Sequence, residues 1–229
     1  MRIFLFVFLL GAFAQAEETI TLNDLKANEV VSRLTDTTSL SWLAVGAVSV
    51  MSVQNSEADI RLDWKDHQKL SRYNSNLGDL LGSGIGSVLI IGSQYAFDDR
   101  RSNWKDHARA LIWQTGIVQV LKFSFGKQRP GNSRDYQSFP SGHTSTAFAS
   151  ATALTYAYGW KAAAIAYPLA AFVGASRLSD DAHWASDVVG GAFLGTLVAR
   201  ASVSEDSVVA RFYPAIGPEG YSLSYLYSF

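Results

Sequence analysis

Residues 140–159 read PSGHTSTAFASATALTYAYG, and this stretch decides how the rest of the chain is interpreted. It opens with Pro140-Ser141-Gly142-His143 and continues as an apolar run rich in alanine. Ser and Gly are favoured at the N-cap of a helix, so we expect Ser141 or a near neighbour to begin one. The first N–H groups of a helix have no acceptor within it, and the helix dipole adds positive potential there. The stretch therefore predicts a helix whose start can bind an anion.

Apolar segments of similar character lie on both sides, separated by polar or charged breaks. Ala, Gly, Leu and Val dominate them, alternation is weak, and their lengths suit helices better than strands. The six segments cover residues 39–53, 77–97, 107–121, 144–159, 161–175 and 186–201. The expected fold is all-α, a helical bundle of about six core helices, with a short extended or β-like C-terminal tail where the sequence alternates near its end.

Length and composition set the outer limits of the interpretation. The 229 residues suffice for one domain with a sizeable core, and a formal net charge of -1 gives no basic field for nucleic acid. The chain has no cysteine, which removes disulfides, thiolate catalysis and cysteine-ligated metals. Whatever chemistry occurs here must use nitrogen and oxygen.

The N-terminus has the pattern of a secretory signal peptide. Met1-Arg2 is followed by an apolar run and then by Ala14-Gln15-Ala16, a small-x-small cleavage site. An uncleaved membrane anchor is the alternative. We expect a signal peptide over residues 1–16, one helical domain over 17–203 with its motif core at 105–201, and a tail over 204–229.

Three cations stand at the ends of apolar segments. Lys122 and Arg129 bracket the end of the third segment, and Arg177 closes the fifth. If neighbouring helices are antiparallel, these side chains converge at one end of the bundle. The planar fork of arginine suits two phosphate oxygens at once, while lysine adds a point charge. Convergence there would create a phosphate site.

His183 and Asp187 are four residues apart, so on a helix they share one face. The carboxylate can then orient the imidazole and leave its other nitrogen to attack phosphorus. His143 can donate a proton to the leaving oxygen. A plain helix-stabilising pair is one alternative, and a metal site using Asp180, Asp181 or Asp187 with the histidines is another, which the fixed cations disfavour.

These motifs resemble those of the type 2 phosphatidic acid phosphatase (PAP2) and vanadium haloperoxidase superfamily, in its phosphatase branch. The resembling motifs are Lys122-x6-Arg129-Pro130, Pro140-Ser141-Gly142-His143 and Ser176-Arg177-x5-His183-x3-Asp187. The resemblance implies a helical core bundle and no required metal or other cofactor. It implies that phosphate is bound by Lys122, Arg129, Ser141, Gly142 and Arg177. It also implies that His183 is the nucleophile, His143 the acid/base and Asp187 the residue that orients His183.

The function that follows is a metal-independent phosphatase acting on a phosphomonoester or diphosphate through a phosphohistidine. A lipid phosphate of the cell envelope is the leading substrate. An exported non-specific acid phosphatase, a vanadate-dependent haloperoxidase and a non-enzymatic envelope protein are the alternatives. The export signal predicts the periplasm or cell envelope. The apolar segments run nearer fifteen residues than the roughly twenty that a membrane span needs, so their relation to a bilayer stays open, as does the oligomeric state.

Overall fold

The computed structural model describes residues 20–131, 133–204, 211–217 and 220–226. The expected signal peptide at residues 1–16 lies outside the described residues. Within them every regular element is a helix apart from one antiparallel hairpin of β1 (Arg211–Gly217) and β2 (Gly220–Leu226). The all-α prediction is therefore confirmed for the bundle.

The helices follow one another through short connections, except for the long segment 126–141 between α7 and α8. In chain order they are the 3-10 helix η1 (Leu22–Leu25), α2 (Ala27–Leu34), α3 (Thr37–Gln54), α4 (Glu57–His67), α5 (Arg72–Gly82), α6 (Ile85–Phe97), α7 (Arg101–Phe125), α8 (Gly142–Tyr158), α9 (Trp160–Ser179) and α10 (Ala185–Ser202). Five of the six apolar segments each form one helix. The sequence also predicted one helix over residues 77–97, and this is wrong, because α5 and α6 are separate helices bent by 51°. Gly84 adopts a φ of 88° between them, a left-handed conformation that ends the first helix.

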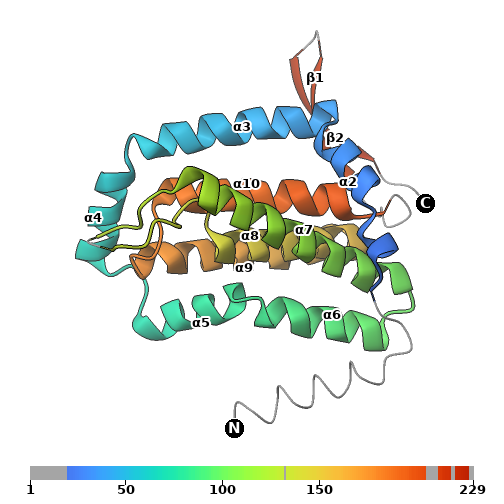
Figure 1. The fold of residues 1–229 in the computed structure, drawn as a ribbon, viewed down its shortest axis with the longest axis horizontal. Helices are drawn as coiled ribbons and strands as arrows, with labels where there is room; N and C mark the ends of the chain where they lie inside the picture. The colour runs from blue at the N-terminus through green and yellow to red at the C-terminus, as the bar shows by residue number, and fades with distance from the viewer. Residues whose placement is uncertain (1–19, 132, 205–210, 218–219, 227–229) are drawn as a thin grey trace.

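Helix α8 forms the centre of the bundle and packs against α7, α9 and α10. Figure 1 shows α3 along one side of this group and α5 with α6 along the opposite side. The helices approach closely because small residues line their contacts. A Cβ added at Gly195 of α10 would lie 2.2 Å from the carbonyl oxygen of Ser145 in α8. Alanines such as Ala149 and Ala199 fill the space between the helices.

Large apolar side chains point outward from the long helices. Those exposed on α3, α5, α6, α7 and α9 include Leu43, Val48, Met51, Leu80, Ile85, Leu89, Ile112, Val120, Phe123, Ile165 and Leu169. Among the described residues, α9 alone is long and apolar enough to cross a membrane, with 28% of its apolar window buried, and the bent pair α5–α6 would add a second span if counted as one.

The polar motifs gather at one end of the bundle. The segment between α7 and α8 and the turn between α9 and α10 meet there, and α4 crosses the same end (Figure 1). The candidate site lies within these segments and the helix ends that they join.

Candidate active site at one end of the bundle

The start of α8 is built as the sequence predicted. Ser141 is the N-cap and is fully buried, and its backbone N–H donates to the carbonyl oxygen of Asp187 over 3.0 Å. Thr144 Oγ1 donates to Ser141 Oγ over 3.0 Å. A Cβ added at Gly191 of α10 would lie 2.6 Å from the Ser141 carbonyl oxygen, so the backbone of α10 packs directly against this turn. Two contacts with the backbone of α10 therefore hold the turn in place.

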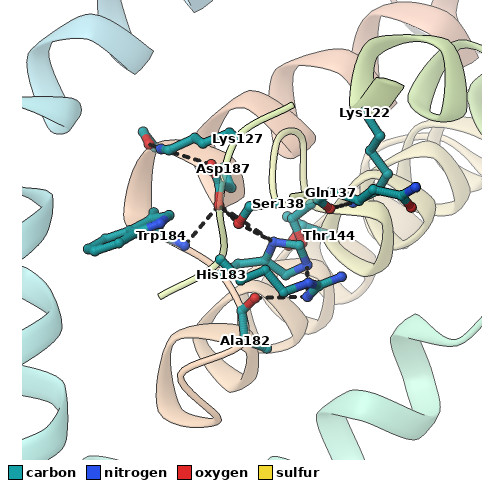
Figure 2. A network of polar contacts seen from close by, with 12 residues as sticks. Lys122, Lys127, Gln137, Ser138, Thr144, Ala182, His183, Trp184 and Asp187 are labelled. Atoms are coloured by element: carbon teal, nitrogen blue, oxygen red, sulfur yellow. Dashed lines mark hydrogen bonds and ion pairs between the residues drawn. The ribbon is translucent and has the colours of Figure 1, made fainter. Parts of the chain in front are cut away.

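His183 is 5% exposed and lies between a cation and a carboxylate. Arg129 Nη1 is 3.2 Å from Nε2, and because arginine can only donate, Nε2 accepts and Nδ1 carries the proton. On the other side Nδ1 lies 3.6 Å from Asp187 Oδ2 and 3.5 Å from Ser138 Oγ (Figure 2). Burial lowers the pKa of His183 to about 4; Asp187 opposes this shift and the charge of Arg129 adds to it. The imidazole is therefore neutral at pH 7, with a lone pair on Nε2.

The pairing of His183 with Asp187 arises differently from the helical turn that the spacing predicted. Helix α10 begins at Ala185, and Trp184 is its N-cap, so His183 lies ahead of the helix. Asp187 occupies the third helical position and turns back toward the N-terminus, where its Oδ2 accepts the Trp184 N–H over 2.9 Å. The shared-face argument is wrong, but the cap geometry brings the same two side chains together.

Two further side chains hold Asp187, and the motifs did not single them out. Ser138 donates a short hydrogen bond to Asp187 Oδ2, and Lys127 Nζ lies 3.0 Å from Oδ1 (Figure 2). Lys127 also contacts Glu57 of α4 at 3.0 Å and Ser186 Oγ at 2.7 Å. Burial alone would raise the pKa of Asp187, but hydrogen bonds from His183 and Ser138 and the charge of Lys127 bring it below its ordinary value. Lys127 lies inside the Lys122-x6-Arg129 motif, a position that could have drawn attention to it.

His143 and Arg177 meet on the other side of the α8 start. Arg177 is buried, and its Nη1 and Nη2 donate to Asp79 Oδ1 at 2.6 Å and to Asp180 Oδ2 at 2.7 Å. His143 Nε2 is 3.2 Å from the same oxygen of Asp79. Burial lowers the pKa of His143, the Arg177 charge lowers it further, and Asp79 opposes both. Asp79 was not predicted, because it lies on α5, far from every motif in the sequence.

Lys122 and Arg129 are the other two cations of the site. Lys122 donates to the Gln137 carbonyl oxygen, and burial together with the Arg129 charge lowers its pKa to about 8. Arg129 also donates to the Ala182 carbonyl oxygen at 2.8 Å and to Asp135 at 2.7 Å. The charges of both cations act on His143 and on His183. The structure thus brings the three predicted cations and both histidines to one place, with Gly142 beside the Lys122 side chain.

The carboxylates proposed for a metal alternative have other partners. Asp180 binds Arg177 and Ser75, and Asp181 forms a two-pronged ion pair with Arg61 of α4 at 2.5 and 2.7 Å. In the part of the chain that the structure describes, no group of three His, Cys, Asp or Glu side chains is placed to hold a metal ion. These two acids orient arginines instead.

The fold and the site together define a helical bundle that gathers two histidines, three cations and a helix N-terminus at one end. Residues 105–205 match the family model of the PAP2 superfamily, the same superfamily that the motifs resemble.

Relatives of known function or structure are similar over part of the chain. A lipid A 1-phosphatase of Porphyromonas gingivalis is 40% identical over 111 residues, which are 47% of this chain and 23% of that protein's length. The crystal structure of Aquifex aeolicus LpxE matches with 27% identity and a TM-score of 0.50, covering 58% of this chain and 87% of that one. The chain therefore spans less than a quarter of the length of the curated relative it matches.

Proposed function

We propose that this protein is a phosphatase of the PAP2 type that removes phosphate from a phosphorylated lipid of the cell envelope through a phosphohistidine. One observation carries the proposal: the buried, neutral His183 presents the lone pair of Nε2 beside Arg129, while His143 and Arg177 lie across the same helix start. A nucleophile, an acid and the cations that stabilise an anionic transition state are the parts that phosphoryl transfer needs.

In the first step, His183 Nε2 attacks phosphorus and the bond from phosphorus to the leaving oxygen breaks. His143 donates its proton to that oxygen, which prevents the release of an alkoxide. Arg129, Arg177 and Lys122 bind the equatorial oxygens, and the backbone N–H groups that follow Ser141 add the potential of the α8 start. Asp187 stabilises the positive charge that forms on the imidazole.

In the second step, water attacks the phosphohistidine. His143, now neutral, takes a proton from the water, and the bond between phosphorus and Nε2 breaks to release phosphate. Both residues return to their starting protonation states. No step needs a metal ion, so the reaction should proceed in excess chelator.

The lipid character of the substrate is supported by the outside of the bundle and by the relatives. Large apolar side chains are exposed on α3, α9 and the α5–α6 pair, and contiguous exposed apolar surface marks a contact with a membrane or a partner. The name of the P. gingivalis relative states that it acts on lipid A. We propose that residues 17–203 form one domain of an exported protein whose apolar faces contact a bilayer and whose site lies near the headgroups.

The test is phosphate release by the purified protein in excess chelator from lipid A, phosphatidic acid, an isoprenyl diphosphate and a soluble aryl phosphate. His183→Ala should abolish release, while His67→Ala, which alters an exposed histidine on α4, should leave it unchanged. A His183→Ala protein that folds and releases phosphate at the parent rate would remove His183 as the nucleophile. A preference for the aryl phosphate would replace the lipid substrate with a small soluble ester.

A further inference from the structure

Asp79 is a carboxylate that bridges two of the proposed active-site residues. Its Oδ1 accepts from Arg177 Nη1 at 2.6 Å and lies 3.2 Å from His143 Nε2. The side chain is 52% exposed, whereas that of Arg177 is 5% exposed, so Asp79 approaches a buried cation from the open side of the site. None of the motifs that define the superfamily region contains this residue.

The placement of Asp79 is fixed by close packing of α5 rather than by chance at a surface. A Cβ at Gly78 would lie 2.4 Å from Ser176 of α9, and a Cβ at Gly82 would lie 2.8 Å from His143 Cβ. Ser75 donates to the Ser176 carbonyl oxygen at 3.3 Å and also binds Asp180. Small residues one helical turn apart thus press this face of α5 onto the site, and Asp79 follows directly after one of them.

We propose that Asp79 is a positioning residue for the proposed phosphatase reaction: it holds the imidazole of His143 in its proton-donating form and orientation and aligns the Arg177 guanidinium. The inference rests on the function proposed above. Asp79 acts through these two side chains and forms no bond to phosphorus.

The charges around His143 explain why such a residue is needed. Arg177 on α9, Arg129 on the segment before α8 and Lys122 on α7 all disfavour a positive imidazole, and burial disfavours it as well. Asp79 is the negative charge among the largest contributions to the pKa of His143. An acid that must donate a proton beside three cations would lose that proton too readily without a carboxylate in contact with it.

The test compares Asp79→Asn and Asp79→Glu with the parent, using pH profiles of kcat/KM and histidine titration by NMR. Asn keeps the shape and removes the charge, so kcat should fall about tenfold at pH 7 with KM little changed. The alkaline limb of kcat/KM should move to lower pH, because His143 then loses its proton sooner. Asp79→Glu should restore much of the rate, and Asp99→Asn at the opposite end of the bundle should match the parent.

The titration does not depend on turnover. His143→Gln identifies the His143 resonance by its loss, and the pKa read from that resonance should be lower in Asp79→Asn than in the parent. An unchanged pKa and pH profile in a folded Asp79→Asn protein would overturn the inference, as would a higher kcat with a lower KM, which would mean that Asp79 competes with phosphate. A parent that releases no phosphate while its His143 pKa still responds to Asp79 would instead overturn the proposed function.

Discussion

Replacement of Gly191 by alanine tests whether α10 sets the position of the anion-binding turn. The added Cβ would lie 2.6 Å from the Ser141 carbonyl oxygen and 3.3 Å from the Ser145 nitrogen. Side-chain Cβ atoms essentially never come within 3.0 Å of such an atom, so the turn and α10 must separate by at least 0.4 Å. The obstructing atoms are backbone and cannot rotate away. The Ser141 oxygen also accepts the first helical bond of α8, from Ser145 N–H at 3.0 Å.

Overpacking of this kind costs about 1–3 kcal/mol, against a gain of about 0.5–1 kcal/mol for alanine over glycine within a helix. We expect a net loss of about 1–2 kcal/mol, which lowers Tm by roughly 2–8 °C in a protein of this size. A misplacement of 1 Å near reacting groups costs about a hundredfold in rate, so a shift of about 0.4 Å should reduce kcat by about tenfold.

The assay pairs thermal unfolding with phosphate release. Gly116→Ala on α7 is the matched control, because a Cβ there has nothing within 4 Å. It should stabilise the protein by about 0.5–1 kcal/mol and leave the rate alone. If Gly191→Ala behaves like Gly116→Ala in both Tm and rate, α10 does not position the turn.

Three further outcomes are expected. Arg177→Lys replaces a two-pronged donor with a point charge, so phosphate release by the folded protein should fall by at least about tenfold; parental release would exclude Arg177 as a phosphate ligand. Lys127→Met removes a charge that lowers the pKa of Asp187, so Asp187 should take up a proton at higher pH and the acid limb of kcat/KM should move upward; an unmoved limb would contradict this. Burial lowers the pKa of His107 to about 4, below its ordinary 6.5. Below pH 6.5 the imidazole is therefore protonated in the unfolded chain but still neutral in the folded one. The free energy of unfolding should fall by up to about 3 kcal/mol between pH 6.5 and 4. His107→Gln should lose less Tm than the parent between pH 7 and 4.5, and an equal loss would show that His107 does not carry the effect.

The sequence predicted those parts of the site whose position depends on local structure. Ser141 is the N-cap of α8, a position that serine favours. Arg177 lies in the last turn of α9, where the helix dipole favours a cation. The helices of the bundle could also be predicted, because the apolar segments have the composition and length of helices. His183 shows the limit of such reasoning, because a spacing of four fits both a helical pair and a cap that reaches back, and the N-cap at Trp184 decides for the second.

Contacts between distant segments could not be predicted from one sequence. Asp79 and Arg177 are 98 positions apart, and Arg61 and Asp181 are 120 apart. The first pair depends on the packing of α5 against α9, and the second depends on α4 crossing the end of the bundle. Arg61 of α4 pairs with Asp181 in the turn that precedes His183, a contact that no local pattern in the sequence indicates.

The environments of the two histidines separate their proposed roles without reference to any family. The His183 side chain is 3% exposed and that of His143 is 35% exposed. Nε2 of His183 accepts a hydrogen bond from the guanidinium of Arg129. A protonated imidazole has no lone pair on Nε2 and could not accept this bond, so His183 is held neutral with a lone pair available for attack. Nε2 of His143 faces a carboxylate, which favours a proton on that nitrogen, and a bound phosphate would favour it further. Exchange of the two roles would require Nε2 of His183 to donate a proton toward Arg129, and the positive charge there opposes that step.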